Sequence, residues 1–163
     1  MRENFKNFLI RDWKPEDRQA AAALIGQVLA EYGLGWEPQG ADADAVEVET
    51  HYRQGEFWVV EQDGRIVGTA GYHPIERGQQ AVEIRKMYLL PSARGQGLGR
   101  WLLQTLESAI AARGFQEVWV ETATVLHQAV GLYEACGYLP AEGVNTSRCD
   151  KVYRKPLTPA KNH

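Results

Sequence analysis

The run Arg94-Gly95-Gln96-Gly97-Leu98-Gly99 places three glycines within five positions, directly after an apolar strand-like segment (82–90) and Pro91. A helical pattern of apolar residues begins inside this run. Because glycine has no Cβ, the backbone here can approach another molecule closely. Peptide N–H groups at a helix N-terminus point at one spot, where the positive end of the helix dipole also attracts an anion. The run therefore predicts a strand, a turn and a helix whose junction suits a pyrophosphate.

Two other glycine motifs do not fit this run. A dinucleotide fingerprint, G-x-G-x-x-G, would need its third glycine where Arg100 stands. A P-loop would need G-x-x-x-x-G-K-[ST], and no such lysine follows any glycine pair. The pattern that remains is R-x-x-G-x-G. The alternative is that this run is a glycine-rich turn that merely starts a helix and binds nothing.

The run resembles the coenzyme A pyrophosphate loop of the GNAT superfamily of N-acetyltransferases. The stretch from Glu83 to Tyr138, about a third of the chain, has the superfamily's order of strand, loop, helix, strand and helix. It ends in LYEACGY, which is similar to the family's LYE-x-x-GY. The resemblance implies an α+β fold with a mixed, mostly antiparallel central sheet, a splayed parallel pair and about four flanking helices.

Periodicity and turn residues predict the other elements. Pro15 suits the first turn of a helix, and Gly33 ends that helix. Asp63-Gly64 is a strong hairpin signal. Thr124 is expected to be the N-cap of the helix over 126–133. The remaining expectations are a strand at 8–11, a helical segment at 41–54, strands at 57–60, 65–72, 82–90 and 118–120, a helix from 98 to 113, and a strand at 150–157.

The composition is that of one globular domain. The chain has 163 residues, 44% of them hydrophobic and 24% charged, and a net charge of −3. We expect a single domain over 1–163 with a frayed tail at 158–163. No basic field favours nucleic acid or an anionic membrane, and no leader or apolar run of about 20 residues is present. Cys136 and Cys149 lack metal-type spacing, so we expect a reduced, cytoplasmic protein without a metal.

The resemblance implies that acetyl-CoA is the co-substrate. Backbone N–H groups of Gly95, Gln96, Gly97, Leu98 and Gly99 would bind the pyrophosphate, with Arg94 adding charge. The backbone of Met87, Tyr88 and Leu89 would pair with the pantetheine arm like an added strand. Leu126 stands where many family members have an asparagine that touches the cofactor. Met87 and Leu89 are expected to be core residues as side chains.

Acetyl transfer to an amine also needs proton transfer. A lysine-like amine has a pKa of about 10.4 and must lose a proton first. Glu83 stands where some family members keep a glutamate base, and Glu121 on the next strand is the second candidate. A salt bridge with a neighbouring cation is the alternative for Glu83. Tyr133 stands where the family's tyrosine acts as general acid toward the thiolate; a core tyrosine is the alternative. The N–H of Leu89 would stabilise the oxyanion.

The acceptor is not fixed by the sequence. The resemblance implies an acceptor region near Trp36, Glu37, Tyr72 and the loop 140–150. A small-molecule amine and a protein amine are both compatible with it, and a homodimer is an open possibility. The function predicted is acetyl transfer from acetyl-CoA to a primary amine by direct attack in a ternary complex. The alternative is a non-catalytic acyl-CoA-binding sensor.

Overall fold

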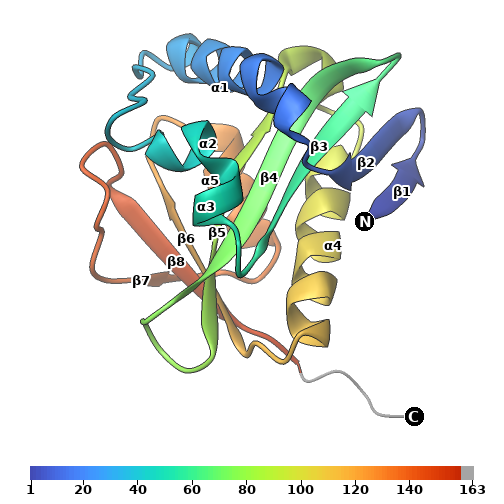
Figure 1. Cartoon of the computed structure of the whole chain (residues 1–163). Coiled ribbons are helices and arrows are strands. Elements are labelled where there is room, and N and C mark those ends of the chain that lie inside the picture. The colour runs from blue at the N-terminus through green and yellow to red at the C-terminus, as the bar shows by residue number, and fades with distance from the viewer. Residues whose placement is uncertain (159–163) are drawn as a thin grey trace. The chain divides into compact units, whose positions relative to one another are not determined.

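A computed structural model describes residues 1–158 of the chain, which form a mixed sheet and five α-helices (Figure 1). The eight strands lie in the order β1-β2-β3-β4-β5-β6-β8-β7. The expected α+β class with a mixed, mostly antiparallel sheet is confirmed. The predicted tail, apart from Thr158, lies outside the described residues. The chain divides into two compact units, one of residues 1–73 and 85–98, the other of residues 74–84 and the chain from residue 99.

The first unit contains an antiparallel run of strands. It holds β1 (Arg2–Phe5), β2 (Phe8–Asp12), β3 (Glu56–Gln62) and most of β4 (Arg65–Ile75), each antiparallel to its neighbour. The turn between β3 and β4 has positive φ at Asp63 and Gly64, +52° and +75°. Those angles suit the tight hairpin that the Asp-Gly pair predicts.

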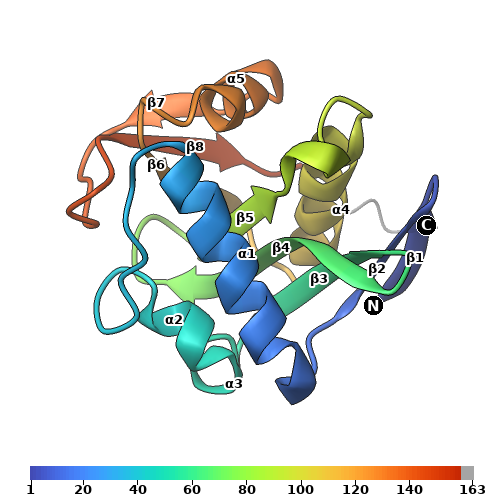
Figure 2. The same cartoon turned by 90° about the horizontal axis from the view of Figure 1, so that it is seen from above.

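Helix α1 (Arg18–Glu31) supplies the core of the first unit. Its apolar face recurs at helical spacing and packs with Ala45 of α2 (Ala43–Val46) and Ile66 of β4. Figure 2 shows α1 lying across β3 and β4, with α2 and α3 (Val48–His51) beside it. The buried face of α1 comprises Leu24, Ile25, Val28 and Leu29.

Two features of the first unit differ from the sequence-based expectation. The helical segment expected over 41–54 is two short helices, because Glu47 between them leaves the helical region at φ −116° and ψ 59°. Strand β1 was not expected, since three of its four side chains are polar and exposed. It forms because the turn at Lys6 folds it back onto β2 as an edge strand.

The second unit is built around β6 (Glu117–Thr122) and β8 (Lys151–Pro156), which pair antiparallel over six residues. The first residues of β5 (Ala81–Leu89) pair with β6 in parallel. The short edge strand β7 (Leu139–Ala141), also not expected, pairs with β8. Helix α4 (Leu98–Ala112) precedes β6, and α5 (His127–Ala135) follows it.

Thr124 is not the N-cap of α5, contrary to the expectation. The helix begins after Leu126, and the Thr124 side chain and backbone N–H both donate to the Asp150 carboxylate, at 2.9 and 2.7 Å. The physical reason is competition between partners. The charged carboxylate of Asp150, in the loop before β8, accepts both the hydroxyl and the backbone N–H of Thr124 and holds this residue outside the helix.

Candidate cofactor and active-site residues

The glycine-rich run forms a turn directly before a helix, as the sequence predicts. Gly95 and Gly97 have φ of +74° and +85°, a region that residues with a Cβ adopt only with strain. A Cβ built at Gly95 would meet no atom within 4 Å, and one at Gly97 would meet only the Phe5 ring, at 3.7 Å. The glycines are therefore required by backbone conformation, and the space above them is open. Because α4 begins at Leu98, its unpaired N–H groups follow directly.

The side chain of Arg94 is held by α1. Its guanidinium donates two hydrogen bonds to Glu31, at 2.5 and 3.0 Å, and a third to the carbonyl oxygen of Leu89, at 3.0 Å. The hydrogen bonds from Arg94 lower the pKa of Glu31. The positive charge of Arg94, which the family resemblance assigns to pyrophosphate binding, is thus paired with the Glu31 carboxylate. Glu31 was not singled out from the sequence, because it lies 63 residues away.

A second cation touches the loop. The Lys6 ammonium donates to the carbonyl oxygen of Gln96 at 2.6 Å, from the turn between β1 and β2. Sequence reasoning missed this residue, since β1 itself was not expected.

Strand β5 is irregular at Lys86. This residue has φ of +55°, the left-handed region, in the middle of a nine-residue strand. The parallel ladder with β6 joins Ala81–Glu83 to Glu117–Trp119, while β5 continues to Leu89 and β6 to Thr122. Beyond the irregularity, Met87, Tyr88 and Leu89 are half-buried. The partly buried side chain of Tyr88 packs against the core that α1 supplies.

The two candidate carboxylates have different surroundings. Glu83 is 8% exposed and stands opposite Trp119 in the ladder. Glu121 accepts the backbone N–H groups of Asn145 and Thr146 on one carboxylate oxygen, at 2.7 and 2.9 Å. Its other oxygen lies 3.7 Å from an Arg77 nitrogen. Glu121 therefore holds the loop between β7 and β8.

Tyr133 lies on α5 within an aromatic cluster. It is 6% exposed, and its ring centroid lies 5.6 Å from that of Tyr138 and 6.4 Å from that of Tyr153. The hydroxyl of the neighbouring Tyr138 donates a hydrogen bond to the Glu107 carboxylate. Burial, together with this carboxylate, raises the pKa of Tyr138. Leu126 is the residue before the first turn of α5, and its N–H donates to the carbonyl oxygen of Ala123 at 2.9 Å.

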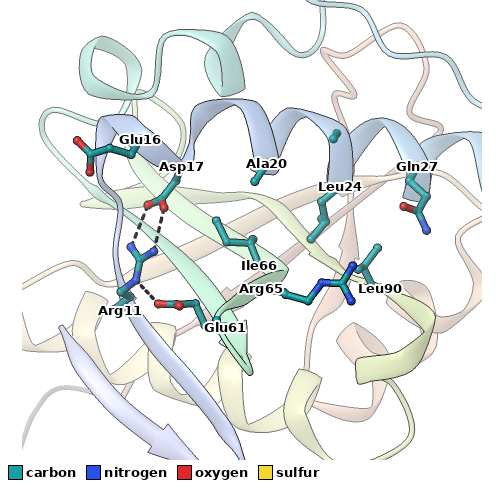
Figure 3. A pocket seen from close by; sticks show the side chains of 12 residues that line it. Arg11, Glu16, Asp17, Ala20, Leu24, Gln27, Glu61, Arg65, Ile66 and Leu90 are labelled. Atoms are coloured by element: carbon teal, nitrogen blue, oxygen red, sulfur yellow. Dashed lines mark hydrogen bonds and ion pairs between the residues drawn. The ribbon is translucent and has the colours of Figure 1, made fainter.

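A cavity of about 470 Å³ lies between α1 and the β3–β4 hairpin (Figure 3). The Arg11 guanidinium binds Asp17 with two hydrogen bonds of 2.9 Å and Glu61 with one of 2.5 Å at its edge. The lining contains no residue predicted for the cofactor or for catalysis. The three charged groups at its edge tie β2 and β3 to the residue before α1.

Two kinds of feature are absent from residues 1–158. Within that part of the chain, no group of three or more His, Cys, Asp or Glu is arranged to hold a metal ion. None of the helices described there is long and apolar enough to cross a membrane.

Comparison with known proteins identifies the family. The model of the acetyltransferase (GNAT) family matches residues 14–138. The chain is 38% identical over 129 residues to the uncharacterized N-acetyltransferase YjgM of Escherichia coli K12, covering 76% of this chain and 77% of that protein. The chain therefore belongs to the GNAT family of acetyltransferases and is an acyltransferase.

Solved structures agree on the fold. A GNAT-family acetyltransferase from Staphylococcus aureus superposes with a TM-score of 0.85 at 16% identity, covering 93% of this chain and 99% of that one. A phosphinothricin acetyltransferase from Sinorhizobium meliloti, solved with acetyl-CoA, superposes with a TM-score of 0.72 at 20% identity, covering 93% and 89%.

Proposed function

We propose that this acetyltransferase moves the acetyl group of acetyl-CoA to a primary amine by direct attack in a ternary complex. The observation that carries the proposal is the pair of left-handed glycines, Gly95 and Gly97, placed directly before α4. Such a backbone, beside the positive end of a helix, would present consecutive N–H groups to an anion. The pyrophosphate of coenzyme A is the anion that the family membership supports.

The second half of β5 is proposed to hold the pantetheine arm. Its backbone from Met87 to Leu89 would pair with the amide groups of the arm as an added strand. The N–H of Leu89 would donate to the thioester oxygen as negative charge develops there. The carbonyl oxygen of Leu89, which belongs to the following peptide unit, already accepts from Arg94, and this contact helps to fix the end of β5.

Proton transfer is assigned to Glu83 and Tyr133. Glu83 is the favoured base because Glu121 already accepts two backbone N–H groups and so has a structural task. The attacking amine forms a bond to the acetyl carbon and loses a proton to this base, directly or through water. The C–S bond then breaks, and the Tyr133 hydroxyl donates a hydrogen bond or a proton to the thiolate.

The experiment is a coenzyme A release assay with a panel that includes small amines, amino acids, aminoglycosides and peptide N-termini. Varying both substrates should give intersecting initial-velocity lines, as a ternary complex requires. Parallel lines would indicate an acyl-enzyme. If no amine in the panel gives coenzyme A release and acetyl-CoA still binds, the sensor alternative is supported.

Binding is measured separately by thermal stabilisation. Acetyl-CoA should raise the midpoint by mass action, and NAD and ATP, which lack the pantetheine arm, should do so far less. Gly97→Val should abolish the shift, since its side chain is strained at φ +85° and blocks the phosphate approach. Gly131→Val is the matched control, because that helical glycine also has open space around it. Unchanged acetyl-CoA affinity in a folded Gly97→Val variant would remove the loop from the site.

A further inference from the structure

Two neighbouring side chains of β5, those of Arg85 and Lys86, reach the same partners. Both donate to the carbonyl oxygen of Ala41 at 3.1 Å. Both also approach Asp44, with Lys86 Nζ at 3.0 Å and Arg85 Nε at 3.6 Å. Successive side chains of a regular strand point to opposite faces. The left-handed backbone at Lys86 removes that alternation and brings both cations to one side.

A lysine in the left-handed region persists only where its surroundings hold it there. Here it is held at both ends. The ammonium, on a residue only 6% exposed, lies between Asp44 and Asp42, the latter at 3.4 Å. The carbonyl oxygen of Lys86 accepts the buried Thr69 hydroxyl at 2.7 Å. Side chain and backbone are therefore fixed independently.

The acidic partners are themselves immobilised. The Tyr52 hydroxyl donates to Asp44 at 2.5 Å, and the N–H of Glu37 donates to Asp42 at 2.8 Å. Burial alone would raise the pKa of Asp44, but Lys86 and Arg85 lower it overall. A buried ion cluster contributes little net stability, and its best-attested use is to select one conformation.

We infer that Lys86 is a positioning residue: its ammonium, clamped by Asp42 and Asp44, holds the left-handed turn of β5 that sets the direction of the peptide groups at Met87, Tyr88 and Leu89. The inference rests on the proposed function, because those peptides are the ones assigned to the pantetheine arm and the thioester oxygen. Lys86 touches neither substrate. It acts through the conformation of the strand that follows it.

We call the contacts of the Lys86 ammonium with Asp42 and Asp44 the clamp. Its proposed role predicts a result that a merely structural ion pair would not give. Lys86→Met and Lys86→Gly both remove the ammonium, but only glycine adopts φ +55° without strain. We expect kcat to fall about tenfold or more in Lys86→Met and no more than about threefold in Lys86→Gly. If Lys86 served stability alone, glycine would be the more damaging change, because it also removes the packed stem.

One further variant separates the effect of charge on stability from the effect of conformation on kcat, and a second serves as a control. Asp44→Asn in the Lys86→Met background removes one of the two carboxylates left without the ammonium and should restore part of the thermal stability but not kcat. Lys155→Met is the matched control, since it breaks the ion pair with Glu107 at 3.1 Å in the second unit. Its kcat should stay within about twofold of the parent when it is measured well below its midpoint. Equal kcat losses in Lys86→Met and Lys86→Gly, or no loss in either, would overturn the inference.

Hydrogen exchange of the peptide spanning 85–90 gives a readout that does not require turnover. Acetyl-CoA should protect these amides in the parent and in Lys86→Gly but not in Lys86→Met. If the parent acetylates no amine yet shows this pattern, the proposed function fails while the clamp stands. If the parent turns over and all three proteins are protected equally, the clamp is wrong and the proposed function is unaffected.

Discussion

The Arg94 guanidinium binds both oxygens of the Glu31 carboxylate, which ties the glycine-rich loop to the C-terminal end of α1. The same guanidinium donates to the carbonyl oxygen of Leu89, the residue assigned to the thioester. One side chain therefore connects the glycine-rich loop, the end of β5 and the end of α1. Its charge is balanced by Glu31 before any phosphate arrives.

Glu31→Gln should tighten the binding of acetyl-CoA. Removing the carboxylate charge leaves an unbalanced guanidinium beside the loop, and we expect the Kd to fall about two- to fivefold at low ionic strength, in line with exposed ion pairs. The effect should shrink in about 0.5 M salt because of screening. Isothermal titration with acetyl-CoA at two salt concentrations measures it. Weaker binding in this variant would mean that Glu31 serves the loop by fixing Arg94 rather than by opposing its charge.

The two carboxylates should separate in their pH profiles. If Glu83 is the base, Glu83→Gln lowers kcat/KM most at neutral pH and less at high pH, where more of the amine is already neutral. Glu121→Gln keeps an oxygen that accepts the N–H groups of Asn145 and Thr146. The decrease in kcat/KM of this variant should therefore be small and the same at every pH. Profiles measured between pH 6 and 10 decide between them. The opposite pattern would transfer the base to Glu121.

Tyr133→Phe keeps the ring in its cluster with Tyr138 and Tyr153, so folding and acetyl-CoA affinity should barely change. If Tyr133 is the general acid, its hydroxyl meets the thiolate mainly in the transition state, and kcat should fall about 100-fold, the lower end for such an acid, with KM nearly constant. Tyr153→Phe is the control within the same cluster. Parent-like turnover in Tyr133→Phe would make Tyr133 a core residue only.

The first unit should lose stability in acid through Asp17. Burial alone would raise the pKa of Asp17, but hydrogen bonds from the Arg11 guanidinium and the Lys14 N–H outweigh it and lower the pKa. A carboxyl whose pKa is lowered on folding adds stability above its unfolded pKa of about 3.9 and loses it as the pH falls through the folded value.

The parent midpoint should therefore fall more steeply than that of Asp17→Asn between about pH 5 and pH 2. Asp63→Asn in the exposed turn is the control, because asparagine tolerates the positive φ there equally well. Thermal melts across this range measure the difference. Parallel curves for the parent and Asp17→Asn would show that the pair with Arg11 does not couple folding to protonation.

The sequence by itself determined the features that depend on local chemistry. Gly95 and Gly97 predicted a turn before a helix, and both adopt the left-handed conformation that glycine enters without strain. Asp63-Gly64 predicted the hairpin for the same reason, and the apolar spacing in α1 predicted its buried face. The family resemblance predicted the mixed sheet. Each of these signals is carried by residues close together in the chain.

Only the tertiary structure decided how distant residues pair. Nothing near Lys86 in the sequence shows that it is left-handed or that its ammonium meets Asp42 and Asp44, because those partners lie more than 40 residues away. Thr124 has the residue type of an N-cap, yet Asp150 takes its hydrogen bonds. Local propensity limits which conformations a residue adopts. The tertiary structure decides which charged and hydrogen-bonding groups come close enough to pair, and the strongest of these partners wins.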